Sequence, residues 1–190
     1  FSWENPAVLE YFKNVLRFWL DRGVDGFRID VSDALIKDTS WADTEDGSPV
    51  IPKDERSAVH RIYRELRAEI DRYAGAMAVI ETGAPDQTVA LFLRPDEMHQ
   101  AFNFRFLKCP WGAGRMTEAI KQSLAAFTAV GAPTTWVIDN HDSTRSATRY
   151  ARTNALTGAY VPEGAATEPL KEEEARRGID RVRAITLLYL

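Results

Sequence analysis

The sequence is short of the residues on which several protein classes depend. Its 190 residues include one cysteine, Cys109, so the chain can form neither an internal disulfide nor a cysteine-based zinc cluster. Its three histidines are scattered and show no HExxH pairing. A single cysteine is more typical of a reducing compartment than of a secreted chain stabilised by disulfides.

The sequence also lacks a long hydrophobic run and a block of like charge. The longest apolar stretch, residues 184–190, is interrupted by Thr186 and is far shorter than the roughly 20 residues that a membrane helix needs. The 24 Lys and Arg residues and the 28 Asp and Glu residues leave a net charge of -4, with no basic stretch that could follow a phosphate backbone. We therefore expect no membrane partner and no nucleic-acid partner.

What is present is typical of a globular protein, with 45% hydrophobic and 27% charged residues. The chain begins with Phe1 rather than Met, and it closes on an apolar stretch without a helix stop signal. We therefore expect residues 1–190 to be a piece of a longer parent polypeptide.

Hydrophobic patterning predicts alternating helices and strands. The first helix begins after a good N-cap, Asn5, with Pro6 in its first turn, and ends at Gly23. Further helices are predicted at 59–73, 85–93, 117–130 and from about 171 onward, and strands at 24–31, 77–82, 100–106 and 135–140. This order favours a parallel sheet covered by helices, either open and doubly wound or closed into a barrel.

The polar ends of the strands favour the barrel. Asp30, Glu81 and Asp142 each lie at or just past the C-terminal end of a predicted strand, where (β/α) barrels keep their catalytic side chains. Four strands are half of such a barrel, which needs about 250 residues in all. We therefore predict the α/β class and a fragment of a (β/α)8 TIM barrel.

Two carboxylates at these strand ends each allow two interpretations. Residues 26–30 read GFRID, so Arg28 and Asp30 share one face of the strand. Either the two side chains form a structural salt bridge, or Asp30 is a nucleophilic carboxylate that the cation of Arg28 keeps ionised. Glu81 ends an apolar run, where desolvation favours the protonated form that a general acid requires, unless the strand simply emerges at the surface there. The triplet NHD at 140–142 is a weak signal by itself.

Taken together and in order, these motifs resemble the α-amylase family of glycoside hydrolases, which carries GFRxD, Glu and NHD on the fourth, fifth and seventh strands of its barrel. The likeness is strongest to the α-glucosidase and oligo-1,6-glucosidase branch. It rests also on WENP at 3–6, LRFWLDRGVDGFRID at 16–30, RPDEMHQAFNF at 94–104 and AVGAPTTWV at 129–137.

The resemblance implies a role for each matching residue. Asp30 corresponds to the nucleophile that forms a covalent glycosyl-enzyme, and Glu81 corresponds to the general acid/base. Asp142 corresponds to the carboxylate that orients the ring hydroxyls and favours the oxocarbenium-like transition state. Arg28 corresponds to the arginine that positions the nucleophile, and His141 to a histidine that contacts the sugar.

The resemblance also implies the activity. We expect a retaining glycoside hydrolase that releases glucose from short α-linked glucosides, with an oligosaccharide or disaccharide as its partner, no cofactor and a cytoplasmic location. The strands before the fourth, the eighth strand and a C-terminal β domain would lie outside residues 1–190, so we expect the fragment alone to be inactive. Two alternatives remain: a transglycosylase or isomerase of the same family, and a non-catalytic barrel that serves as a binding scaffold.

Two histidines, a tryptophan and a glycine pair also allow predictions. His60 is expected on a solvated helix face, and His99 is expected to be structural or to line the barrel mouth. Trp41, in the acidic loop after Asp30, is a candidate for stacking on a sugar. Residues 112–114 (GAG) lack the third glycine of a dinucleotide-binding loop, so no nicotinamide or flavin is predicted, and no metal site is assigned.

Overall fold

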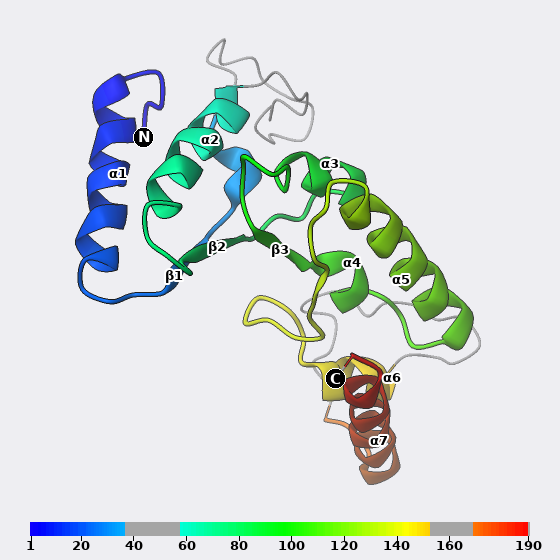
Figure 1. Ribbon diagram of the computed structural model, residues 1–190. Coiled ribbons are helices and arrows are strands. Elements are labelled where there is room, and N and C mark those ends of the chain that lie inside the picture. Colours follow the sequence, from blue (N-terminus) through cyan, green and yellow to red (C-terminus); the bar gives the residue numbers. More distant parts are fainter. Residues whose placement is uncertain (37–57, 153–168, 190) are drawn as a thin grey trace, which may run out of the picture. The chain divides into compact units, whose positions relative to one another are not determined.

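A computed structural model describes residues 1–36, 58–152 and 169–189 (Figure 1). The chain divides into two compact units. Unit 1 contains residues 1–102 and 126–134, and unit 2 contains residues 103–125 and 135–190. Each unit has a hydrophobic core of its own, so each is described by itself.

Unit 1 begins with helix α1 (Pro6–Leu20), which starts where the sequence predicts. The side chain of Asn5 accepts a hydrogen bond from the backbone N–H of Ala7 at 3.0 Å, and Pro6 occupies the first turn. The unit also contains helices α2 (Ala58–Ile70) and α3 (Asp86–Leu91) and a short 3-10 helix, η1 (Ser32–Ala34).

Parallel strands run beside one another in this unit. They are β1 (Gly26–Ile29), β2 (Met77–Ile80) and β3 (Gln100–Asn103), with β2 between the other two. Gly26 permits the close approach of β1 and β2, because a Cβ there would lie 2.2 Å from the carbonyl oxygen of Met77. Since the strands are parallel, their C-terminal ends lie at the same edge of the sheet.

Apolar side chains from the helices and strands of unit 1 form its core. Phe27 and Ile29 pack against this core, which confirms that this face of β1 is apolar and leaves the opposite face to Arg28. The most deeply buried side chains of the core, each at most 1% exposed, are Val59, Ile62, Tyr63, Ile70, Ala78, Ile80, Met98, Ala101 and Phe127.

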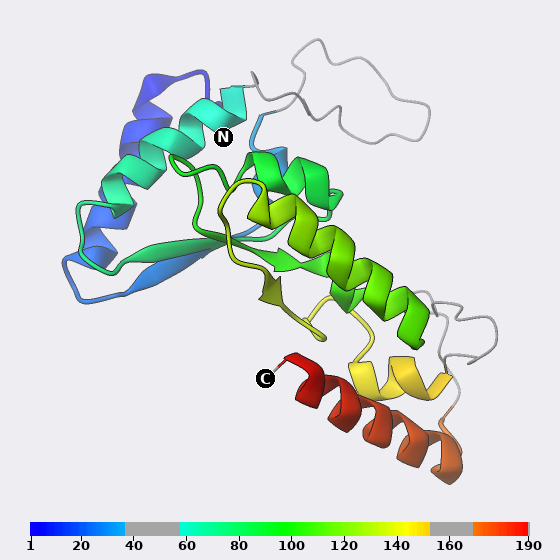
Figure 2. The ribbon, with the colours of Figure 1, turned by 45° about the vertical axis from the view of Figure 1, so that its right-hand side comes forward.

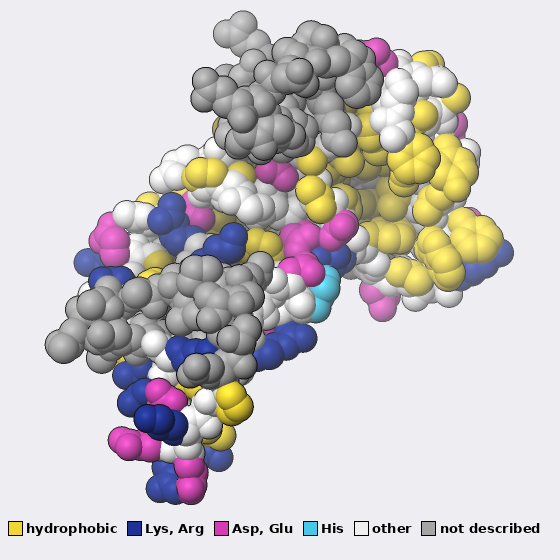
Figure 3. Space-filling model, turned by 180° about the vertical axis from the view of Figure 1, so that it is seen from behind, with side chains coloured by type: hydrophobic (Ala, Val, Ile, Leu, Met, Phe, Trp, Pro, Cys, Tyr) yellow, Lys and Arg dark blue, Asp and Glu magenta, His cyan; other side chains and the backbone are white. Residues whose placement is uncertain are grey.

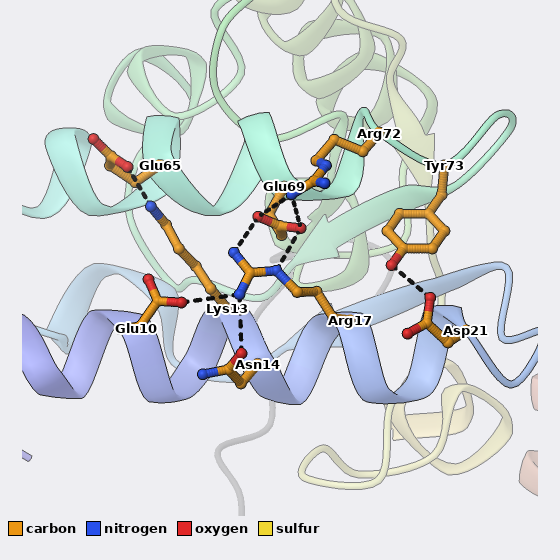
Figure 4. Close-up of polar contacts among 9 residues, drawn as sticks. All are labelled: Glu10, Lys13, Asn14, Arg17, Asp21, Glu65, Glu69, Arg72 and Tyr73. Atoms are coloured by element: carbon orange, nitrogen blue, oxygen red, sulfur yellow. Dashed lines mark hydrogen bonds and ion pairs between the residues drawn. The ribbon is translucent and has the colours of Figure 1, made fainter.

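Polar side chains join α1 to α2 at the surface of this core (Figure 4). Arg17 donates from Nε and Nη2 to the two carboxylate oxygens of Glu69, at 2.8 and 2.7 Å, and Arg72 contacts the same carboxylate at 3.0 Å. Glu69 is only 5% exposed. The hydrogen bonds from Arg17 lower the pKa of Glu69 and outweigh the opposite effect of burial.

The two histidines of unit 1 are structural. The prediction for His60 is wrong: its side chain is 2% exposed, packs on the ring of Phe92 and lies with Nδ1 2.7 Å from the buried carboxylate of Glu97. The helical pattern of α2 could not show that another segment covers this face. His99 accepts a hydrogen bond from the backbone N–H of Ala78 at 3.1 Å, and burial lowers the pKa of its ring.

Unit 2 is mainly helical. It contains α4 (Phe104–Leu107), most of α5 (Ala113–Thr128), strand β4 (Thr135–Trp136), α6 (Ser146–Arg152) and α7 (Glu172–Tyr189). Figure 2 shows α6 and α7 side by side. Gly178 makes this packing possible, because a Cβ there would lie 2.1 Å from the carbonyl oxygen of Ala147. The buried core consists of Phe106, Cys109, Met116, Ala119, Tyr150 and Ile185.

All four predicted strands are shorter in the structure than in the prediction. The strand predicted at 100–106 ends at Asn103, whose side chain accepts a hydrogen bond from the backbone N–H of Phe106 at 2.9 Å and thereby caps α4. The strand predicted at 135–140 is paired only over β4. In both places side chains bind backbone groups that a longer strand would use: Asn103 caps α4, and the carbonyl oxygens of Ile138 and Asn140 accept from arginine side chains.

Large hydrophobic side chains remain at the surface of unit 1. Figure 3 shows hydrophobic side chains gathered on one face of it. Among the residues of this unit that the structure describes, the exposed large hydrophobic side chains are Phe1, Tyr11, Phe18, Trp19, Val24, Val31 and Met77. No helix in the described part of the chain is long and apolar enough to cross a membrane.

The exposed apolar surface and the predicted missing strands lead to a first prediction. Residues 1–190 expressed alone should aggregate or remain partly unfolded, because open strand edges and an uncovered core invite association. Size-exclusion chromatography with light scattering and a thermal scan by circular dichroism would test this. A monodisperse monomer with a cooperative melting transition would contradict it.

Substitution of the carboxylate between α1 and α2 gives a second, pH-dependent prediction. The pKa of Glu69 is lower in the folded chain than its ordinary value of 4.5, so its stabilising effect is present above that pH and is lost as the pH falls through the folded pKa. In the parent polypeptide, Glu69→Gln should lower the free energy of unfolding by about 1 to 3 kcal/mol at pH 7 and by progressively less below about pH 4.

The matched control is Glu65→Gln on the same helix. Glu65 pairs with Lys13, but half of its side chain is exposed, so its loss should cost less than about 1 kcal/mol. Urea denaturation at several pH values measures both variants. A cost at Glu69 that does not change between pH 7 and pH 3 would refute the proposed origin of the stabilisation.

Candidate active site

A single guanidinium joins the two carboxylates that follow β1 and β2. Nη1 of Arg28 lies 2.8 Å from Oδ1 of Asp30, and Nη2 of the same side chain lies 2.8 Å from Oε2 of Glu81. The interpretation of Arg28 and Asp30 as a neighbouring ion pair is therefore confirmed. The second carboxylate on the same cation is a feature that the spacing in the sequence could not show.

The parallel register explains why these side chains meet. Ile29 lies opposite Ile80, and the backbone N–H of Glu81 donates to the carbonyl oxygen of Ile29 at 2.9 Å. The residues that follow the two strands are thus brought to the same edge of the sheet. Arg28, which points away from the apolar core, reaches both of them.

The two carboxylates differ in their exposure to solvent. The side chain of Asp30 is 66% exposed and that of Glu81 is 10% exposed. The alternative in which Glu81 emerges at the surface is therefore wrong for this structure. Burial favours the neutral form of Arg28, but the nearby carboxylates of Glu81 and Asp30 outweigh it and raise the pKa of Arg28, so the side chain stays cationic.

Unit 2 carries the other two predicted site residues on the segment between β4 and α6. Nε2 of His141 lies 3.3 Å from Oδ2 of Asp142, and both side chains are about two-thirds exposed. The loop is tied down at its base: the carboxylate of Asp139 accepts hydrogen bonds from the backbone N–H of Ser146, at 2.7 Å, and from its hydroxyl group.

Arginines hold the same loop through its backbone carbonyls. Arg149, on α6, donates to the carbonyl oxygens of Ile138 and Thr144, at 2.6 and 2.7 Å. Arg145 donates to the carbonyl oxygen of Asn140 at 2.5 Å. His141 and Asp142 are therefore presented by a segment with fixed ends.

The five predicted site residues divide between the two units. The structure brings Asp30, Arg28 and Glu81 together in unit 1, and it brings His141 and Asp142 together in unit 2. The meeting of all five in one site stays a prediction. Trp41 lies outside the described residues, and among those that are described no group of three His, Cys, Asp or Glu side chains is arranged to hold a metal ion.

Comparison with known proteins identifies the family. Residues 1–162 match the family described as alpha amylase, catalytic domain. The chain belongs to the α-amylase family. The catalytic domain of this family is a (β/α)8 barrel, with which the parallel sheet of unit 1 agrees.

Curated relatives and solved structures are similar to the chain over most of its length. It is 32% identical over 130 residues to the trehalose-6-phosphate hydrolase of Escherichia coli K12, covering 66% of this chain and 23% of that protein. It is 27% identical over 187 residues to an alpha-glucosidase of Schizosaccharomyces pombe, covering 84% and 31%.

Among solved structures, that of the trehalose-6-phosphate hydrolase of Bacillus licheniformis, mutant R201Q, superimposes with a TM-score of 0.64. The sequence identity is 23%, and the match covers 78% of this chain and 29% of that one, so this likeness concerns the fold. The chain spans less than a third of the length of each of these three proteins.

Three residues that support the site in this α-amylase family chain are not marked as functional by any sequence motif. Ser32 and Tyr63 contact the segments that carry Asp30 and Glu81, and Asp139 anchors the loop of unit 2. Tyr63 lies in the helix predicted at 59–73, where its hydroxyl group is the one available signal. For Ser32 the sequence holds no signal, because its partner is a backbone carbonyl 49 residues away.

The anchoring of the unit 2 loop generates a third prediction. Asp139→Ala in the parent polypeptide should lower the free energy of unfolding by about 1 to 2 kcal/mol, because the start of α6 loses the acceptor for its N–H and hydroxyl groups. Asp139→Asn retains one acceptor oxygen and should lose less. Urea denaturation, with amide exchange at Ser146, measures the effect. The control is Asp180→Ala, at an exposed side chain of α7. Equal costs for Asp139→Ala and the control would show that the anchor contributes nothing.

Proposed function

We propose that the chain carries the central part of the catalytic barrel of a retaining glycoside hydrolase that releases glucose from short α-linked glucosides. One observation carries this proposal: the guanidinium of Arg28 lies between Asp30 and Glu81 at the ends of adjacent parallel strands. A retaining glycosidase needs two carboxyl groups about 5 to 5.5 Å apart, with different protonation states at rest. Arg28 holds the two carboxyl groups beside one another, and their different exposure to solvent gives them different environments.

The proposed roles follow from the exposure of the two carboxylates. Asp30 is open to solvent and paired with a cation, which suits an ionised nucleophile that attacks the anomeric carbon. As the glycosidic C–O bond breaks, Glu81 donates its proton to the leaving oxygen. In the second step Glu81 takes a proton from water, whose oxygen attacks the anomeric carbon and releases Asp30.

Arg28, Asp142 and His141 support this reaction in the proposal. Arg28 orients the nucleophile and keeps it ionised, for which its raised pKa is suitable. Asp142 and His141, on the tethered loop of unit 2, would orient ring hydroxyls and stabilise positive charge on the sugar in the transition state. Their exposure leaves both side chains accessible to a ligand.

We further propose that β1 to β4 correspond to the fourth to seventh strands of the barrel, with the remaining strands and a C-terminal β domain outside residues 1–190. The names of the relatives, an alpha-glucosidase and a trehalose-6-phosphate hydrolase, support a small glucoside as substrate. A cytoplasmic location stays a prediction. Transfer of the glucosyl group to a second sugar would use the same carboxylates, whereas a non-catalytic scaffold would have no need to retain them.

The test is a time course by proton NMR with the parent polypeptide. Maltose, isomaltose, sucrose and trehalose-6-phosphate are offered separately, and the first anomer of glucose released is recorded. Two successive displacements at the anomeric carbon, with Asp30 as nucleophile and Glu81 as acid/base, retain its configuration. We therefore expect α-glucose to appear first. Initial β-glucose from sucrose or trehalose-6-phosphate, whose other product is not glucose, would exclude the retaining mechanism. A new disaccharide would move the proposal to a transglycosylase.

Variants connect this activity to the residues. Asp30→Asn should lower kcat/KM by roughly 10⁴-fold or more, as the loss of a nucleophile does. Asp25→Asn, an exposed neighbour just before β1, should leave it unchanged. Equal activity of the two variants would reject Asp30 as the nucleophile.

A further inference from the structure

Ser32 links the ends of the two strands that carry the proposed nucleophile and acid/base. Its side chain is fully buried. Both its hydroxyl group and its backbone N–H donate to the carbonyl oxygen of Glu81, each at 2.8 Å. Ser32 lies two residues after Asp30, so one backbone oxygen of Glu81 is held by two donors from the segment of the nucleophile.

Tyr63 fixes Ser32 from the other side. The hydroxyl group of Tyr63, on α2, donates to the carbonyl oxygen of Ser32 at 2.6 Å, and no part of the Tyr63 side chain is exposed. Burial raises the pKa of Tyr63 far above its usual range, so the hydroxyl group keeps its proton and donates this hydrogen bond to Ser32. The chain of contacts runs from helix α2 through Ser32 to the backbone of Glu81.

The backbone between Asp30 and Ser32 needs such a restraint. Val31 has φ 42° and ψ 51°, the left-handed region that a β-branched residue rarely adopts. Its side chain is more than half exposed, so packing of that side chain does not account for the conformation. The turn places Ser32 against Glu81, and the hydrogen bonds of Ser32 hold the turn in place.

We infer that Ser32, supported by Tyr63, is a positioning residue that sets Glu81 relative to Asp30 for proton transfer. The inference rests on the proposed function. Proton donation depends on the distance and angle between the acid and the leaving oxygen. A shift of the Glu81 backbone would therefore slow the cleavage of a substrate whose leaving group must be protonated more than the cleavage of one whose leaving group needs no proton.

Substrates with different leaving groups separate these effects. The parent polypeptide and its Ser32→Ala variant are assayed with a disaccharide, whose leaving group must be protonated, and with α-glucosyl fluoride, whose leaving group depends far less on an acid. The loss of one hydrogen bond should lower kcat/KM for the disaccharide about tenfold and for the fluoride by less than about threefold. Ser123→Ala, at another fully buried serine, should change neither value.

Conservative variants distinguish positioning from a loss of stability. Ser32→Thr keeps the hydroxyl donor and should restore the wild-type ratio of the two kcat/KM values, even where its extra methyl group lowers the melting temperature. Tyr63→Phe should show the same preference for the fluoride as Ser32→Ala. If Ser32→Ala fails to fold, the ratio in Tyr63→Phe decides.

The outcomes also separate the two proposals. Equal losses with both substrates, or no loss in Ser32→Ala and Tyr63→Phe, would overturn the positioning role while the hydrolase proposal stands. A wild-type parent that turns over neither substrate would overturn the proposed function, and the positioning role with it.

Discussion

The shared salt bridge of Arg28 is the interaction on which the proposed site depends. Arg28 contacts the exposed carboxylate of Asp30 and the buried carboxylate of Glu81 at once, and so holds the two side chains beside one another. The bridge forms because parallel strands in this register place both carboxylates beside one edge of the sheet. Gly26 allows the strands to approach, and Ser32 ties their ends together.

Elsewhere in unit 1, buried charge is accommodated in the same way. Glu97 is fully buried and is satisfied by His60, by Arg64 at 3.1 Å and by Arg94 at 2.6 Å. These contacts attach α2 to the segment that leads into β3. Helix α2 also provides Tyr63, which binds Ser32 beside the proposed site. The contacts of Glu97 therefore help to position α2 and Tyr63, although they include no proposed catalytic group.

In unit 2 the predicted site residues are exposed and lie on a loop. His141 and Asp142 are open to solvent, yet the segment around them is held by side chains bound to its backbone. Asp139 anchors the start of α6.

Local patterns in the sequence determined the parts of the protein that depend on neighbours along the chain. These are the capped first helix, the alternation of helices and strands, the two faces of β1 and the motifs that identify the family. Only the tertiary structure decided which distant groups meet. The burial of His60, the end of β3 at Asn103 and the bonds of Ser32 to Glu81 depend on partners that other elements supply, and periodicity carries no information about such partners.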